Sequence, residues 1–166
     1  MNETFHKLFI EKLHILYYIE EELIKRVPRR IEHARDSELK DALESHLEET
    51  KKQLERVGEL LESFGEEPNG IPFPPLDVLL EESEPSLEIE DLSLRDAIII
   101  ASVQAIEHLE IALYGTASSW AKAMDHARAH ELLSETLEEE KSGDERLSEL
   151  AEDSINEKAA GTEKSE

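Results

Sequence analysis

The sequence lacks cysteine altogether, which excludes a disulfide framework and any metal site built on thiolates. Glycine and proline are scarce, with six of each in 166 residues, so long stretches contain nothing that interrupts a helix. No apolar run approaches the roughly 18 residues that a membrane-spanning helix needs, and the first residues do not resemble a secretory signal. We therefore expect a cytoplasmic protein that does not enter a membrane.

Basic residues are also few, since 18 of them face 41 acidic residues and leave a net charge of -23. Such a surface repels phosphate backbones, so nucleic acid is not an expected partner. The excess charge has two interpretations. It would keep a halophilic protein soluble at high salt, where ions screen the repulsion, or it would bind cations across the surface. We favour the halophilic interpretation.

What the sequence does contain is Glu, Leu, Ala and Lys, with apolar residues at spacings of three and four, which is typical of amphipathic helices. The pattern predicts four long helices, at about 4–34, 37–65, 93–124 and from 125 onward. The second helix begins at a cap formed by Asp36 and Ser37 and ends near Gly65. Pro28 is expected to kink the first helix. Ser93 and Asp96 resemble a capping box at the start of the third.

Residues 66–92 differ from the rest because several prolines and a glycine prevent a continuous helix. A short helix is expected at 76–83, in a connection long enough to travel the length of a bundle. Two helix pairs joined by one long crossover form a ferritin-like connection. The fold class is therefore all-α, a ferritin-like four-helix bundle over residues 1–155. Residues 156–166 are polar and are expected to form a disordered tail.

The two halves of the sequence resemble each other at an offset of 90 residues. Residues 46–57 (HLEETKKQLERV) and 136–147 (TLEEEKSGDERL) are identical at six of twelve positions. The same offset aligns Glu20 with Glu110 and Glu49 with Glu139. Acidic pairs align by chance in so acidic a chain, but the apolar positions match at the same offset, which favours a duplicated helix pair.

Several acidic residues interrupt the apolar stripes instead of lying on exposed faces. Glu20 does so in the first helix, and Glu107 and Glu110 do so in the third at a spacing that places both on one face. The remaining candidates lie near the inner lines of the second and fourth helices: His46, Glu49, Glu139 and Glu140.

An ionised carboxylate inside a helical core is costly unless it is paired, and no Lys or Arg is apparent on the inner stripes around these positions. Bound cations would supply the missing charge. Oxygen ligands with one imidazole suit iron, manganese or, less selectively, zinc, and two divalent ions would offset four carboxylates. Alternatively, the glutamates lie at the stripe edges and reach solvent, and His46 is an ordinary hydrogen-bonded residue.

Four motifs in this order resemble the YciE/YciF-type ferritin-like proteins: LHxLYxxE at 13–20, HLEETKxQ at 46–53, EHxEIAxYGT at 107–116 and EEEKxxDE at 138–145. The likeness spans roughly residues 5–152. It implies a metal-binding helical bundle, commonly dimeric, associated with stress responses. The Glu-x-x-His motifs of the wider di-iron superfamily are missing, because Lys52 follows Glu49 and Ser142 follows Glu139 at that spacing. A carboxylate-rich, histidine-poor centre is implied.

The first functional hypothesis is a di-iron or di-manganese protein that acts in oxidative or metal stress. Glu20 and Glu110 would be terminal or chelating ligands, and Glu49 and Glu139 would bridge the metals. His46 and Glu107 would complete or adjust the coordination. The alternative is a non-enzymatic, stress-related homodimeric module with a degenerate metal site. A storage cage is a weaker third hypothesis, because a fold alone does not imply a shell.

Overall fold

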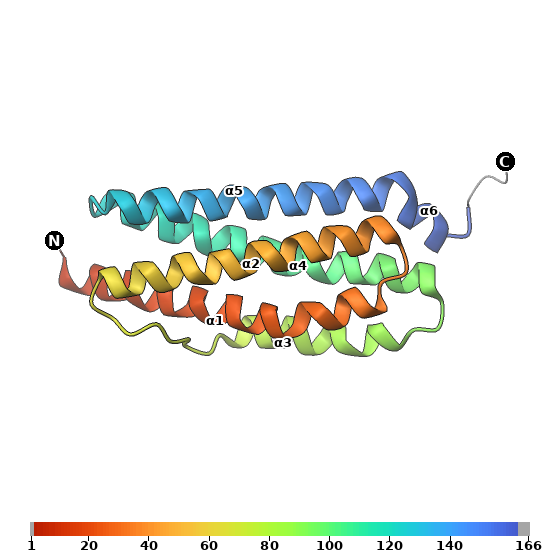
Figure 1. The fold of residues 1–166 in the computed structure, drawn as a ribbon, viewed down its shortest axis with the longest axis horizontal. Coiled ribbons are helices and arrows are strands. Elements are labelled where there is room, and N and C mark those ends of the chain that lie inside the picture. Colours follow the sequence, from red (N-terminus) through yellow and green to blue (C-terminus); the bar gives the residue numbers. More distant parts are fainter. Residues whose placement is uncertain (1, 163–166) are drawn as a thin grey trace.

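The computed structural model describes residues 2–162, which contain helices and no strand, so the all-α prediction is confirmed (Figure 1). The helices are α1 (Glu3–His33), α2 (Ser37–Ser63), α3 (Pro74–Ser83), α4 (Leu92–Ala123), α5 (Ala127–Leu150) and α6 (Asn156–Ala159). A 3-10 helix, η1 (Glu84–Glu88), follows α3, and a π-helical turn, η2 (Ala151–Ile155), joins α5 to α6.

The four long helices α1, α2, α4 and α5 lie side by side along the molecule (Figure 1). Helix α1 packs against α2 and α4, and α5 packs against the same two helices from the other side. Residues 64–91 run back along the bundle and carry α3, so α2 and α4 point in the same direction. This arrangement directs one face of each long helix into a common interior.

Local signals set several helix ends as the sequence predicts. The Asp36 side chain caps α2 by accepting hydrogen bonds from the backbone N–H groups of Glu38 and Leu39. Gly65 follows the end of α2 with a φ of +80°, a conformation that favours glycine. Helix α1 continues unbroken through Pro28.

The start of α4 differs from the prediction of a capping box at Ser93. The cap is Asp91, whose side chain accepts hydrogen bonds from two N–H groups of the first turn. Asp96 is buried and contacts the connection between α1 and α2. Its two carboxylate oxygens accept hydrogen bonds from the backbone N–H groups of Arg35 and Asp36 at 2.7 and 2.8 Å. Asp96 therefore holds the turn between α1 and α2 instead of capping its own helix.

The prediction of a disordered tail from residue 156 is wrong for the first part of that segment. Residues Asn156–Ala159 form α6, which packs against α4. Ile155 is buried just before it, and the Lys158 ammonium donates a hydrogen bond to Asp36 at 3.1 Å. The burial of Ile155 and the hydrogen bond to Asp36 therefore order this polar segment. Residues 163–166 of the predicted tail lie outside the described residues.

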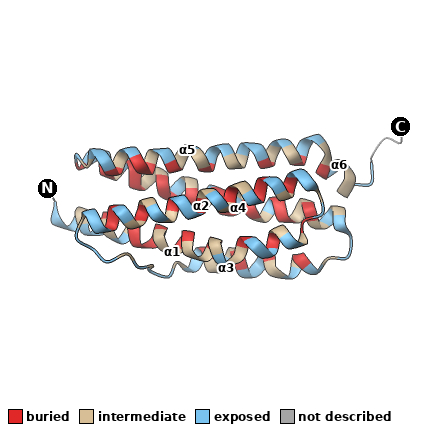
Figure 2. Ribbon diagram, viewed as in Figure 1, coloured by how far each residue is buried: buried red, intermediate tan, exposed pale blue. Residues whose placement is uncertain are grey.

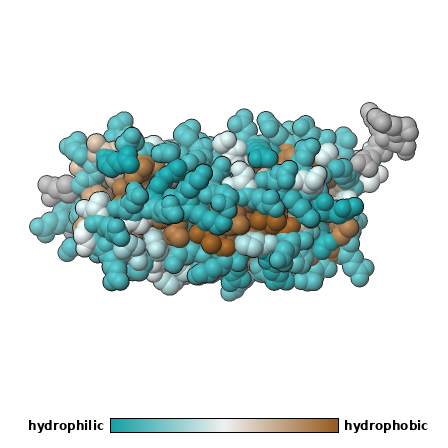
Figure 3. All heavy atoms as spheres, in the orientation of Figure 1, coloured by the Kyte–Doolittle hydropathy of each residue, from teal (hydrophilic) through white to brown (hydrophobic). Residues whose placement is uncertain are grey.

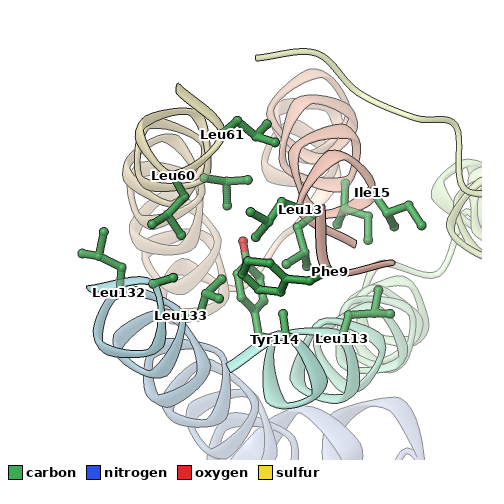
Figure 4. Packing of buried hydrophobic residues seen from close by; sticks show 14 of the residues in the cluster. Phe9, Leu13, Ile15, Leu60, Leu61, Leu113, Tyr114, Leu132 and Leu133 are labelled. Atoms are coloured by element: carbon green, nitrogen blue, oxygen red, sulfur yellow. The ribbon is translucent and has the colours of Figure 1, made fainter. Parts of the chain in front are cut away.

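Buried residues lie on the inner faces of the long helices (Figure 2), and the apolar ones form two clusters. Figure 4 shows part of the larger one, in which Tyr114 points from α4 into the interior among leucines of the other helices. Among the buried apolar residues of α2, the smaller cluster ends at Leu43 and the larger begins at Val57. Buried polar residues occupy the layer between them.

Helix α4 alone among the described helices is long and apolar enough to cross a membrane by length and composition. That criterion is weak evidence, since core helices also meet it. Here the helix packs against α1 and α5, and its buried face carries Glu107 and Glu110. The face of the molecule in Figure 3 is mainly hydrophilic, with apolar side chains in a band across the centre and in a patch at the upper left. The expected absence of a membrane role stays a prediction.

Candidate metal centre

All four long helices contribute a polar side chain to the layer between the two apolar clusters. Glu20 comes from α1, His46 from α2, Glu107 and Glu110 from α4, and Glu140 from α5. The four glutamates are at most 1% exposed, and the histidine is 8% exposed. Such burial of carboxyl groups is rare and costly without compensation. The stripe-edge interpretation is therefore wrong for these four glutamates.

The closest group in this layer consists of His46, Glu107 and Glu140, whose ligand atoms all lie within 4.8 Å of one another. The Nδ1 atom of His46 lies 3.2 Å from Oε1 of Glu107. Burial lowers the pKa of His46 to about 4, so the imidazole is neutral near pH 7. A neutral imidazole beside two carboxyl groups is a suitable donor set for a divalent ion.

Repulsion between the carboxylates of this layer raises their pKa values further than burial alone does. Burial and the neighbouring Glu140 charge raise the pKa of Glu107 to about 11, and the same two causes raise the pKa of Glu20 and of Glu110 well above the usual value. Burial also raises the pKa of Glu140 itself, to about 7. The four carboxyl groups cannot all ionise together unless positive charge enters the layer.

Many oxygen atoms in the layer have no hydrogen-bond donor. They are Oε2 of Glu20, Glu107 and Glu140, and both oxygens of Glu110. Glu107 and Glu110 each contact the Glu140 carboxyl, but such a contact is a hydrogen bond only if one partner keeps its proton. Protons or metal cations must therefore compensate these oxygens, and the donor set fits oxygen-seeking divalent ions.

Neighbouring side chains orient two of the carboxyl groups. The buried Tyr114 hydroxyl donates a hydrogen bond to Oε1 of Glu20. The amide of Gln53, also buried, donates to Oε1 of Glu140 at 2.5 Å. Each of these two carboxyl groups thus keeps one oxygen anchored and leaves its Oε2 without a partner.

Glu49 and Glu139, the pair expected to bridge the metals, lie at the edge of the layer. Glu139 is 26% exposed and accepts two hydrogen bonds from Arg56, at 2.5 and 2.8 Å. Glu49 is only partly buried, and burial together with the Glu139 charge raises its pKa. No arginine was expected on the inner stripes around these positions, but Arg56, beside the stripe of α2, reaches the edge of the layer and neutralises Glu139. Whether either residue binds metal stays a prediction.

Sequence reasoning missed Arg56 and Gln53, which contact the acidic layer from α2. A signal for the arginine exists in the internal repeat, where Arg56 aligns with Arg146. Burial and the Glu139 charge raise the pKa of Glu49, and the positive charges of Lys52 and Arg146 only partly oppose that rise. Gln53 is the last residue of the HLEETKxQ motif, but its role as a donor to Glu140 depends on which way α5 turns Glu140.

Comparison with known proteins places the chain in a family. A family model described as a domain of unknown function, DUF892, matches residues 4–160. Protein YciF of Escherichia coli is 35% identical over 95% of this chain and 96% of its own length.

Solved structures agree. The crystal structure of the E. coli stress protein YciF superposes with a TM-score of 0.86 at 34% identity, covering 94% of this chain and 99% of that one. YcfI of Rhodopseudomonas palustris, described as a candidate structural protein, has a TM-score of 0.83 at 39% identity, covering 87% of this chain and 92% of that one. A Xanthomonas campestris protein shares the fold, with a TM-score of 0.77 at 21% identity over 95% of this chain and 97% of that one. The chain therefore belongs to the DUF892 family, and YciF is its relative.

Proposed function

We propose that this protein binds a pair of divalent metal ions, iron or manganese, at the centre of a ferritin-like four-helix bundle. The observation that carries the proposal is the set of buried carboxyl oxygens without donors around the neutral His46. Four carboxylates and two divalent ions balance in charge, which removes the repulsion that otherwise keeps the protons on.

The ligands would be Glu20, Glu107, Glu110 and Glu140 with His46. Bound iron or manganese would supply redox chemistry toward a small oxidant, as expected of a protein that acts in oxidative or metal stress. The chain itself positions the ligands. Tyr114 and Gln53 fix one oxygen each of Glu20 and Glu140, and the two apolar clusters keep bulk water away from both sides of the layer.

Metal analysis of protein purified without chelators tests this proposal. The wild type should carry close to two ions per chain, and Glu110→Gln should lose at least half of them because it removes a fully buried charge of the centre. Glu138→Gln is the matched control, since Glu138 lies on the exposed face of α5 and should leave the metal content unchanged. Less than one ion per chain in the wild type, or equal contents in all three proteins, would contradict the proposal.

The alternative proposal is a non-enzymatic, stress-related module in which protons take the place of metal. The contacts of Glu140 with Glu107 and Glu110 support it, because each becomes a hydrogen bond when a proton is retained. The description of the relative YcfI as a candidate structural protein points the same way. Thermal unfolding separates the two proposals: a metal-free protein whose melting temperature ignores added Mn²⁺ and Fe²⁺ supports the module.

The biological setting follows from the same reasoning. We propose a cytoplasmic homodimer that acts during stress, as the relative YciF is named a stress protein. The net charge of -23 supports a role at high salt, where the repulsion is screened. The molar mass in solution tests the dimer. Unfolding curves at low and high salt test the adaptation, which predicts lower stability at low salt.

A further inference from the structure

A small cavity lies against one side of the proposed metal centre, between α2, α4 and α5. His46 and Glu107 line its buried part, whereas Ser142 and Arg146 on its wall are exposed to solvent. The cavity therefore extends from the surface to two of the proposed ligands. Its volume of about 80 Å³ admits a few water-sized molecules and is too small for a ligand of drug size.

Gly143 lies on the wall of this cavity, in the interior of α5. Its backbone does not require glycine, because its φ is not among the positive values in the described chain. Glycine in a helix interior is less favourable than alanine, so its presence here calls for another explanation. A Cβ atom at this position would lie 3.2 Å from both carboxylate oxygens of Glu107, tighter than an ordinary contact. The missing side chain is what leaves room beside Glu107.

The internal repeat shows how the two sides of the centre differ. The residue of α2 that aligns with Gly143 is Gln53. Gln53 is 1% exposed and fills its side of the layer, where its amide donates to Glu140 at 2.5 Å and to Glu139 at 3.1 Å. At these two aligned positions, the glutamine of α2 fills the space beside the centre, whereas the glycine of α5 leaves that space empty.

We propose that this cavity is the entrance through which a small polar molecule of the peroxide class reaches the centre, and that Gly143 sets its size limit. The lining suits such a molecule, because Arg146 and the hydroxyl groups of Ser45 and Ser142 donate hydrogen bonds and Glu49 accepts them. Molecules of about two to four non-hydrogen atoms fit the space. The inference rests on the proposed metal centre, which gives the entering molecule its target.

The test uses the full chain loaded with Co²⁺, whose visible absorption changes when an external ligand joins its coordination, and azide as the probe. Metal analysis first gives the Co²⁺ content of each protein, and an azide titration then gives the dissociation constant. The variants are Gly143→Ala, which adds one methyl group beside Glu107, and Gly143→Leu, which fills the cavity. Gly115→Ala is the matched control, because its Cβ would meet only Leu137 at an ordinary 3.9 Å.

The expected result is an unchanged Co²⁺ content in all variants, with azide binding weakened about threefold in Gly143→Ala and about tenfold or more in Gly143→Leu. Gly115→Ala should bind azide as the wild type does. Wild-type azide affinity in Gly143→Leu at full Co²⁺ content would overturn the entrance and leave the metal centre standing. Loss of Co²⁺ from both Gly143 variants would also overturn it, because the glycine would then be needed to hold the metal. A wild type that binds no Co²⁺ overturns the metal centre and the entrance together.

Discussion

Raising the pH should destabilise the metal-free protein, in contrast to the acid denaturation common among proteins. The folded state holds protons on buried carboxyl groups more tightly than the unfolded state does, so unfolding releases protons and becomes easier as the pH rises. For Glu140 the pKa rises from 4.5 to about 7 on folding. The stabilisation is complete below pH 4.5 and is lost between pH 4.5 and 7.

The magnitude is large enough to measure. Each pKa unit corresponds to about 1.4 kcal/mol, so Glu140 alone removes about 3 kcal/mol from the free energy of unfolding across this range. Glu107, with a pKa of about 11, extends the loss through neutral pH. Domains of this kind have total free energies of unfolding of about 5–15 kcal/mol, so a substantial part of the stability is at stake.

Urea unfolding followed by far-ultraviolet circular dichroism, on chelator-treated protein at fixed salt, gives this free energy at each pH. Glu140→Gln removes the titrating group and retains an acceptor for the Gln53 amide, so its stability should exceed that of the wild type increasingly above pH 4.5. Glu138→Gln makes the same charge change on an exposed face and should follow the wild type. A constant difference between Glu140→Gln and wild type from pH 4.5 to 8 would refute the reasoning. Added Mn²⁺ at about 100 times its dissociation constant should restore about 2.7 kcal/mol to the wild type for each ion bound.

Three further substitutions test the contacts around the centre. Tyr114→Phe should lower the free energy of unfolding of the metal-free protein by about 1–3 kcal/mol in urea, because Glu20 loses its buried donor. Arg56→Ala should cost about 1 kcal/mol in the same assay, since its two bonds to Glu139 are partly screened by solvent; no change would show that the pair is merely a surface contact. Asp96→Ala should cost about 1–3 kcal/mol and speed amide hydrogen exchange in the turn between α1 and α2, because two backbone N–H groups lose their acceptor. Unchanged exchange there would contradict this role.

The helices were predictable because their signals are local. An apolar spacing, an aspartate at position 36 and a glycine at position 65 act within a few residues of the chain, and the structure places helix ends beside each. Asp96 was misassigned because its partners are about 60 residues away, in the turn before α2. Helix α6 was missed for the same reason, since Ile155 and a contact with Asp36 order a stretch that looks unstructured by composition.

The residues of the candidate site also differ in whether a local sequence signal identifies them. Glu20, Glu107 and Glu110 were identifiable because each interrupts an otherwise apolar stripe, and all three are buried. Periodicity places Glu140 on the stripe of α5 with Glu139 beside it, but the repeat aligns Glu139 with Glu49 and so favoured the more exposed of two residues about 100° apart around the helix axis. Packing against α2 decides between them, by turning Glu140 inward to Gln53.

The broken symmetry of the repeat also limits the charge of the centre. Where α5 places Glu140 in the layer, α2 places the fully buried and neutral Thr50 at the aligned position. One helical turn away the roles are exchanged: α2 supplies His46 to the layer, and the aligned residue of α5 is the buried, neutral Thr136. A glutamate at position 50 would have added a fifth buried carboxylate, which two divalent ions would leave without compensation. The substitution pattern of the two halves therefore yields four carboxylates and one neutral imidazole, the composition that two divalent ions neutralise.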